Sequence, residues 1–133
     1  MKPMTIGELS RLANVKVTTI RYYESIRLMP TPDRSPTGRR LYGAEALHRL
    51  SFIRQARDIG FPMQSIRNLI DVQTRPDSDC GSVDAIARQQ LTEVQRRLSK
   101  LTALESELKR MLGACHGGQV DNCQVLAALN DRI

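Results

Sequence analysis

Three cysteines in the C-terminal half are the residues best suited to chemistry. The 133-residue chain has three cysteines, Cys80, Cys115 and Cys123. An odd number argues against a disulfide scaffold and favours metal binding, redox chemistry or burial. Cys80 lies in a polar connector with breakers, and the other two bracket a loop containing Gly117 and Gly118. These are poor places for core packing, so we predict a metal site.

The donor set predicts a soft cation, because thiolates select soft metal ions. Three thiolates suit trigonal Hg(II) or Pb(II), whereas Zn(II) or Cd(II) needs a fourth ligand such as His116, Asp79 or water. A thiol redox switch is an alternative hypothesis, in which oxidation to a disulfide or sulfenate replaces the metal. A metal-sequestering protein with an incidental basic face is another. An iron–sulfur cluster is disfavoured, since four clustered cysteines are wanted.

The segment between Cys80 and Cys115 decides which sulfur atoms can meet. Residues 82–113 contain no proline and no interior glycine, which predicts one long helix. The two cysteines lie about 50 Å apart at about 1.5 Å per residue, so one chain cannot bring them together. In a two-fold antiparallel pair centred between residues 97 and 98, residue 80 faces residue 115. We therefore predict two sites per homodimer, each combining Cys80 of one protomer with Cys115 and Cys123 of its partner.

The apolar pattern of this helix also indicates a partner. Apolar residues recur at spacings of three and four along a narrow seam, as in a coiled coil. Glu105 interrupts the seam, with Leu104 beside it. The seam consists of Ala87, Leu91, Val94, Leu98, Leu101, Leu108 and Leu112.

The N-terminal half shows the outline of a winged helix-turn-helix. Thr5 followed by Glu8 predicts a capping box at the start of a first helix, and a second short helix begins at about Thr18. Prolines and glycines in residues 28–43 predict a short hairpin with a basic tip. Helical periodicity returns over 44–59 and 66–72, and Val125, Leu126 and Leu129 mark a final short helix.

The net positive charge belongs to this half. Residues 1–75 carry 13 Lys and Arg against 6 Asp and Glu, whereas residues 76–133 carry 7 against 8. Such a split predicts a duplex-binding surface. The candidate phosphate contacts are the cations Lys16, Arg21, Arg39 and Arg40 and the tyrosines Tyr22, Tyr23 and Tyr42, with one of the adjacent tyrosines expected to pack inward.

Four segments resemble the MerR family of transcription regulators in order and spacing. The resemblance covers nearly the whole chain. The segments are Thr5-Ile6-Gly7-Glu8-Leu9, Thr19-Ile20-Arg21-Tyr22-Tyr23-Glu24, Gly38-Arg39-Arg40-Leu41-Tyr42 and Arg54-Gln55-Ala56-Arg57-Asp58-Ile59-Gly60-Phe61.

This resemblance implies a homodimer that binds double-stranded promoter DNA, bends and untwists it, and meets RNA polymerase at the shared promoter. Sequence-dependent deformability of the DNA would then matter as much as base contacts. The DNA contacts carried over from the family are Arg21, Tyr23, Arg39, Arg40 and Tyr42, with Thr18 and Thr19 at the start of the recognition helix.

Within the family, this sequence is similar to two kinds of metal sensor. Sensors of monovalent copper and gold resemble it in the seven residues between Cys115 and Cys123, but carry Ser at the position of Cys80. Divalent sensors carry Cys there, usually with an eight-residue loop. Cys80 counts for more than the loop length in choosing between these two kinds of sensor. An added thiolate changes the number of ligands and the charge of the site, whereas one loop residue adjusts only geometry. A soft divalent effector (Hg, Pb, Cd or Zn) is therefore expected, with Cu(I) as the alternative.

We predict a mainly α protein with a winged helix-turn-helix DNA-binding region (1–75), a connector (76–81), an antiparallel coiled-coil dimerisation helix (82–113) and a C-terminal metal-binding loop with a short helix (114–133). No catalytic constellation is found: His48 and His116 lie far apart in sequence and no phosphate-binding glycine loop is present. No signal peptide or membrane span is found, which favours a cytoplasmic location.

Overall fold

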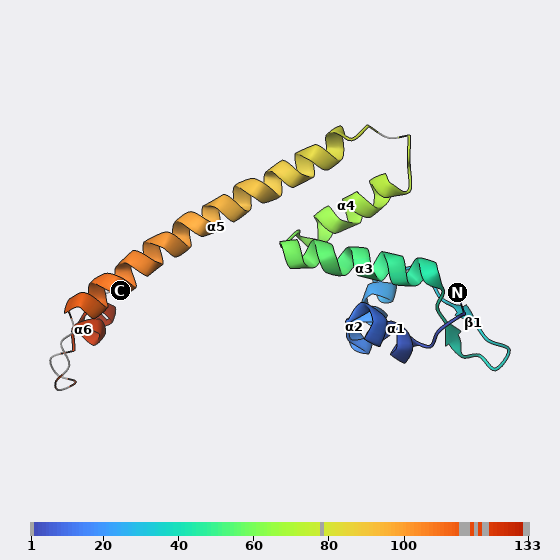
Figure 1. Cartoon of the computed structure of the whole chain (residues 1–133), viewed down its shortest axis with the longest axis horizontal. Coiled ribbons are helices and arrows are strands. Elements are labelled where there is room, and N and C mark those ends of the chain that lie inside the picture. Colours follow the sequence, from blue (N-terminus) through green and yellow to red (C-terminus); the bar gives the residue numbers. More distant parts are fainter. Residues whose placement is uncertain (1, 78, 115–117, 119, 121–122, 132–133) are drawn as a thin grey trace. The chain divides into compact units, whose positions relative to one another are not determined.

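The computed structural model describes residues 2–77, 79–114, 118, 120 and 123–131. The chain divides into two units, Met1–Ile86 and Ala87–Ile133. The described elements are α1 (Ile6–Ala13), α2 (Val17–Ser25), β1 (Asp33–Arg34), β2 (Arg40–Leu41), α3 (Ala44–Ile59), α4 (Met63–Gln73), α5 (Gly81–Ala114) and α6 (Gln124–Asn130) (Figure 1). The predicted mainly helical fold with a hairpin wing, one long helix and a terminal helix is confirmed.

The helix-turn-helix begins at the predicted N-cap, Thr5. The Thr5 hydroxyl accepts a hydrogen bond from the Glu8 amide at 3.2 Å and donates one to the Glu8 carboxylate at 3.2 Å. Helix α1 ends at Asn14, whose φ of 56° is left-handed. Helix α2 follows after a short turn and begins at Val17, one residue before the predicted start.

The hairpin wing is short, as predicted. Strands β1 and β2 pair antiparallel, with Arg34 opposite Arg40. The tip is closed by hydrogen bonds from the Ser35 amide to the Arg39 carbonyl at 2.7 Å and from the Gly38 amide to the Ser35 carbonyl at 2.8 Å. Gly38 has a φ of 84°, a conformation that glycine adopts without a Cβ penalty.

The core of the first unit is built from aliphatic side chains on four helices. Helix α3 ends at Gly60, whose φ of 97° turns the chain toward α4. The side chains that lose all solvent exposure are Leu9 of α1, Ile20 of α2, Leu50 and Ile53 of α3 and Ile66 of α4. This aliphatic core fits a sequence without tryptophan.

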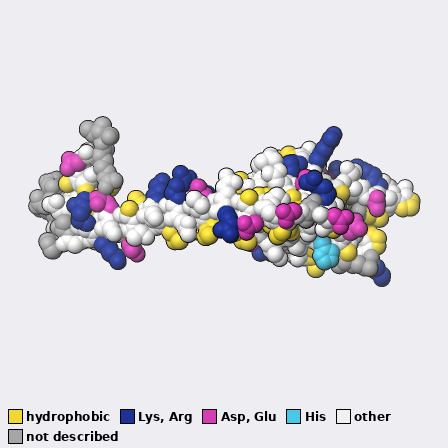
Figure 2. All heavy atoms as spheres, turned by 90° about the horizontal axis from the view of Figure 1, so that it is seen from above, with side chains coloured by type: hydrophobic (Ala, Val, Ile, Leu, Met, Phe, Trp, Pro, Cys, Tyr) yellow, Lys and Arg dark blue, Asp and Glu magenta, His cyan; other side chains and the backbone are white. Residues whose placement is uncertain are grey.

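Helix α5 is the longest described element, with 34 residues. It extends the predicted helix by one residue at each end, so its midpoint still lies between residues 97 and 98. Hydrophobic side chains lie open along it (Figure 2). The exposed leucines are Leu91, Leu98, Leu101, Leu104, Leu108 and Leu112. Among the described residues, no helix is long and apolar enough to cross a membrane.

Candidate DNA-binding surface and metal-binding residues

The cationic and hydroxyl side chains predicted to contact DNA come from α2 and the wing. Lys16, the residue before α2, is exposed, and so are Thr18 and Arg21, while Thr19 is half-buried. On the wing, Arg39 is exposed and Arg40 is half-buried. These side chains are accessible to a duplex, and their contacts with DNA stay predictions.

Two of the three candidate tyrosines, Tyr23 and Tyr42, lie in the core. Tyr23 is 7% exposed and Tyr42 is 2% exposed. Of the adjacent pair, Tyr23 packs inward because it lies one helical turn after the buried Ile20, whereas Tyr22 is 55% exposed. Any DNA contact by Tyr23 or Tyr42 stays a prediction, and their rings serve packing in this structure.

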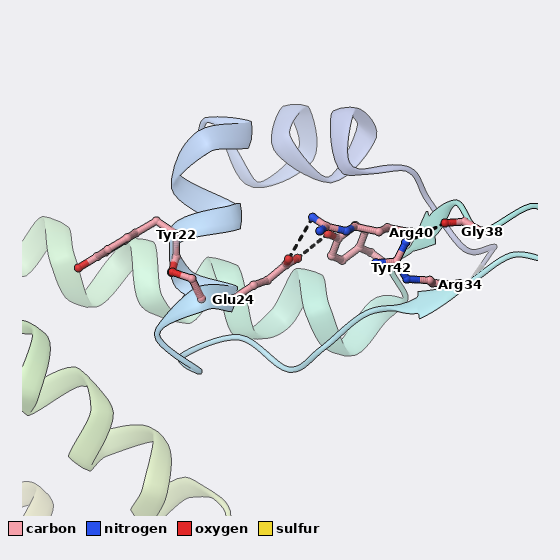
Figure 3. Close-up of polar contacts among 7 residues, drawn as sticks. Tyr22, Glu24, Arg34, Gly38, Arg40 and Tyr42 are labelled. Atoms are coloured by element: carbon pink, nitrogen blue, oxygen red, sulfur yellow. Dashed lines mark hydrogen bonds and ion pairs between the residues drawn. The ribbon is translucent and has the colours of Figure 1, made fainter.

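Sequence reasoning missed Glu24, which joins helix α2 to the wing. Its carboxylate accepts a hydrogen bond from the Tyr42 hydroxyl and lies 3.5 Å from the Arg40 guanidinium (Figure 3). The Glu24 side chain is only 12% exposed. The available signal was its position one turn after Ile20, because a carboxylate on the buried face of a helix requires a partner.

This environment changes the acidity of Tyr42. Burial and the hydrogen bond to the Glu24 carboxylate raise the pKa of Tyr42 from 10.0 to about 12, since both disfavour the phenolate. The nearby Arg40 guanidinium opposes this rise. Tyr42 is therefore a neutral hydrogen-bond donor across the physiological pH range.

A pH prediction follows from this raised pKa. Because the pKa of Tyr42 is higher in the folded chain than in the unfolded one, its stabilising contribution is complete below pH 10 and is lost as the pH rises toward about 12. We expect the ultraviolet phenolate titration of the wild type minus that of Tyr42→Phe to be centred near pH 12. A difference titration centred near pH 10 contradicts the buried donor.

Two of the predicted thiol ligands belong to the described residues. Cys80 is exposed and immediately precedes α5, where its carbonyl accepts a hydrogen bond from the Asp84 amide at 3.0 Å. Cys123 is half-buried and caps α6, with its amide donating to the Val120 carbonyl at 3.0 Å. Cys115 and His116 lie outside the described residues. The other candidate, Asp79, is exposed.

Within one chain, the described residues include no group of three His, Cys, Asp or Glu side chains able to hold a metal. A helix of 34 residues is about 50 Å long, so α5 holds the residues at its two ends far apart. The chemistry of the donor set nevertheless fits a soft cation, because thiols stand beside both ends of that helix. A site that joins Cys80 to the thiols that follow α5 would need two chains, which stays a prediction.

Comparisons with known proteins agree with this architecture. Residues 4–73 match the family model of the MerR HTH family regulatory protein, and residues 47–111 match the model described as MerR, DNA binding. The chain is 37% identical to the HTH-type transcriptional regulator HmrR of Rhizobium leguminosarum bv. viciae, covering 96% of this chain and 98% of the relative. It is 32% identical to heavy metal-dependent transcription regulator 2 of Rhizobium meliloti (strain 1021), covering 92% and 84%.

A solved structure extends the similarity to three dimensions. The transcription regulator PbrR691 from Ralstonia metallidurans CH34, crystallised in complex with lead(II), matches with a TM-score of 0.81 and 37% identity, covering 95% of this chain and 98% of that one. The family models and relatives describe transcription regulators and not enzymes. The chain therefore belongs to the MerR family of DNA-binding transcription regulators, within its heavy-metal-dependent branch.

Proposed function

We propose that this protein is a homodimeric regulator that distorts promoter DNA when a soft divalent cation, Hg(II), Pb(II), Cd(II) or Zn(II), binds Cys80 of one protomer and Cys115 and Cys123 of its partner. His116 is a possible additional ligand. The observation that carries the proposal is helix α5, which begins directly after Cys80 and ends directly before Cys115. The lead(II) complex of PbrR691 supports a soft divalent ion.

The dimer is supported by the way two α5 helices can pair symmetrically. An antiparallel pair centred between residues 97 and 98 places residue i of one chain opposite residue 195 − i of its partner. This register sets Leu91 opposite the partner's Leu104 and Val94 opposite the partner's Leu101. Each pair covers side chains that are exposed or half-buried in the single chain. The same register sets residue 80 opposite residue 115.

The coupling between metal and DNA is an equilibrium between two states of the dimer. Bound metal ties the segment before α5 of one chain to the segment after α5 of its partner, and so biases the dimer toward the state that bends and untwists DNA. RNA polymerase then meets the distorted promoter. The coupling can be no larger than the difference in metal affinity between the two states.

A metal panel tests this function directly. Purified reduced protein is titrated with Hg(II), Pb(II), Cd(II), Zn(II) and Cu(I) in competition, and the same ions are tested in a promoter–reporter assay. We expect a response to at least one divalent ion and its loss in Cys80→Ser, because removal of a thiolate ligand lowers the metal affinity by at least about 100-fold.

Two outcomes contradict the proposal. A reporter that responds to no ion overturns the metal-responsive function, and a response to peroxide in its place supports the redox alternative. A response to Cu(I) alone, or divalent selectivity unchanged in Cys80→Ser, overturns the assignment of a divalent ion. The matched control is Ser82→Ala, two residues along the chain, which removes a hydroxyl and leaves the three thiols intact.

A further inference from the structure

One half-buried carboxylate connects the two elements predicted to touch DNA. Glu24 lies in the last turn of α2, the recognition helix, and its side chain reaches the wing (Figure 3). There it accepts a hydrogen bond from the Tyr42 hydroxyl and pairs with Arg40 at 3.5 Å. Since Arg40 belongs to β2, one carboxylate ties the helix to the hairpin.

The Tyr42 end of this link is rigid. The ring is 2% exposed, and the backbone of Tyr42 forms a bridge with Met4 through hydrogen bonds of 2.8 and 2.9 Å. The hydroxyl is therefore held at a fixed place in the core and presents its proton to Glu24. A rigid donor on one side and a helix on the other leave the carboxylate little freedom.

The Arg40 end of the link remains accessible. Its side chain is 38% exposed and directs one guanidinium nitrogen toward Glu24. A guanidinium has five N–H donors in a fixed plane, so donors remain for a DNA phosphate while one side is held. Holding one edge of the plane sets the direction in which the others point.

Charge alone predicts that Glu24 weakens DNA binding. A carboxylate close to a DNA-binding face repels phosphates, so its removal by itself should strengthen binding to every duplex. Glu24 is nevertheless placed beside a predicted phosphate contact and is nearly buried. Its geometric effect must then outweigh this electrostatic cost.

We propose that Glu24 is a positioning residue for DNA recognition, which fixes the wing and Arg40 relative to the recognition helix so that both fit one duplex at once. The inference rests on the DNA-binding part of the proposed function. A sequence-specific complex needs the base-reading helix and the phosphate-binding wing in register. Non-specific binding needs only charge, so loss of the link affects specific binding far more.

The experiment compares specific and non-specific binding by the full-length protein. The specific probe is a duplex that the wild type selects from a random pool, and the non-specific probe has the same bases in scrambled order. In Glu24→Leu, which removes the acceptor and keeps a similar volume, we expect the ratio of the two affinities to fall about 10-fold. Glu24→Gln keeps an acceptor for the Tyr42 hydroxyl and should restore part of the ratio.

Two further variants separate positioning from charge and folding. Asp33→Asn removes an exposed negative charge from β1 of the wing, and it should strengthen both affinities equally and leave the ratio unchanged. Tyr42→Phe breaks the link from its other end, so its ratio should fall in the same direction, and the double variant Glu24→Leu/Tyr42→Phe should fall by less than the product. Tyr42→Phe keeps the ring and carries the test if Glu24→Leu does not fold.

The possible failures are distinguishable. If the wild type selects no sequence from the pool, the proposed DNA-binding function fails. If the wild type selects a sequence but Glu24→Leu and Tyr42→Phe keep its affinity ratio, the positioning inference is overturned. The inference is also overturned if Asp33→Asn lowers the ratio as much as they do, because charge then explains the effect.

Discussion

A mixed dimer that joins one Cys80→Ser chain to one Cys115→Ser chain is expected to bind one metal ion, where the wild-type dimer binds two. In the proposed register, Cys80 of the second chain meets Cys115 and Cys123 of the first, so one complete site forms. The other site loses two thiolates. Each homodimer of a single variant has two incomplete sites and should bind at least about 100-fold more weakly.

This experiment requires two differently tagged chains produced together and purified through both tags. Binding is measured as the stoichiometry of Pb(II) or Hg(II) by thiolate-to-metal absorbance. The control is a mixture of the two homodimers kept under conditions without subunit exchange, which should show neither site. If the mixed dimer binds no better than this control while the wild type binds two ions, the ligands come from one chain and the interchain site is wrong.

Local rules explain why much of the fold was predictable from the sequence. The N-cap at Thr5, the turn at Gly38 and the stop at Gly60 are set by neighbouring residues, and each appears at its predicted place. Helix α5 was predicted to within one residue at both ends, because residues 82–113 contain no proline and no interior glycine. The start of α2 was less clear, since Val17 has weak helix propensity and no side chain caps the helix.

The candidate DNA-binding surface was harder to predict, because it depends on contacts between residues distant in sequence. Nothing in the local pattern reveals that the Tyr42 hydroxyl meets Glu24, 18 residues earlier. The one-turn spacing from Ile20, in contrast, does place Tyr23 and not Tyr22 on the core side of α2. A tyrosine suits either a phosphate contact or a core position, and the tertiary fold decides between them. The proposed cysteine site lies outside a single chain, since it would join ligands from two chains of a dimer.

Leu101→Glu is expected to convert the dimer to monomers. Leu101 is 62% exposed in the single chain, and the proposed register places it opposite the partner's Val94. Two-fold symmetry means that one substitution buries two carboxylates in an apolar seam. The cost is at least about 4 kcal/mol per dimer, which corresponds to a dimer Kd raised about 1000-fold.

Sedimentation equilibrium measures this shift, and metal stoichiometry on the same sample shows whether the sites disappear with the dimer. The matched control is Ala103→Glu, which adds the same charge two residues away, at an exposed position outside the seam. It should remain a dimer with two metal sites. A Leu101→Glu protein that stays dimeric at the concentration of the control contradicts the seam.

The register itself can be tested at Glu105, the polar residue that interrupts the seam. Glu105 is exposed in the single chain, and a polar residue inside an apolar seam specifies alignment at a cost in stability. In Glu105→Leu the dimer should therefore be tighter, while other alignments become accessible. Because those alignments separate Cys80 from the partner's Cys115, metal stoichiometry should fall as dimer affinity rises. A dimer that gains affinity and keeps both metal sites would show that the helix ends or loops set the register.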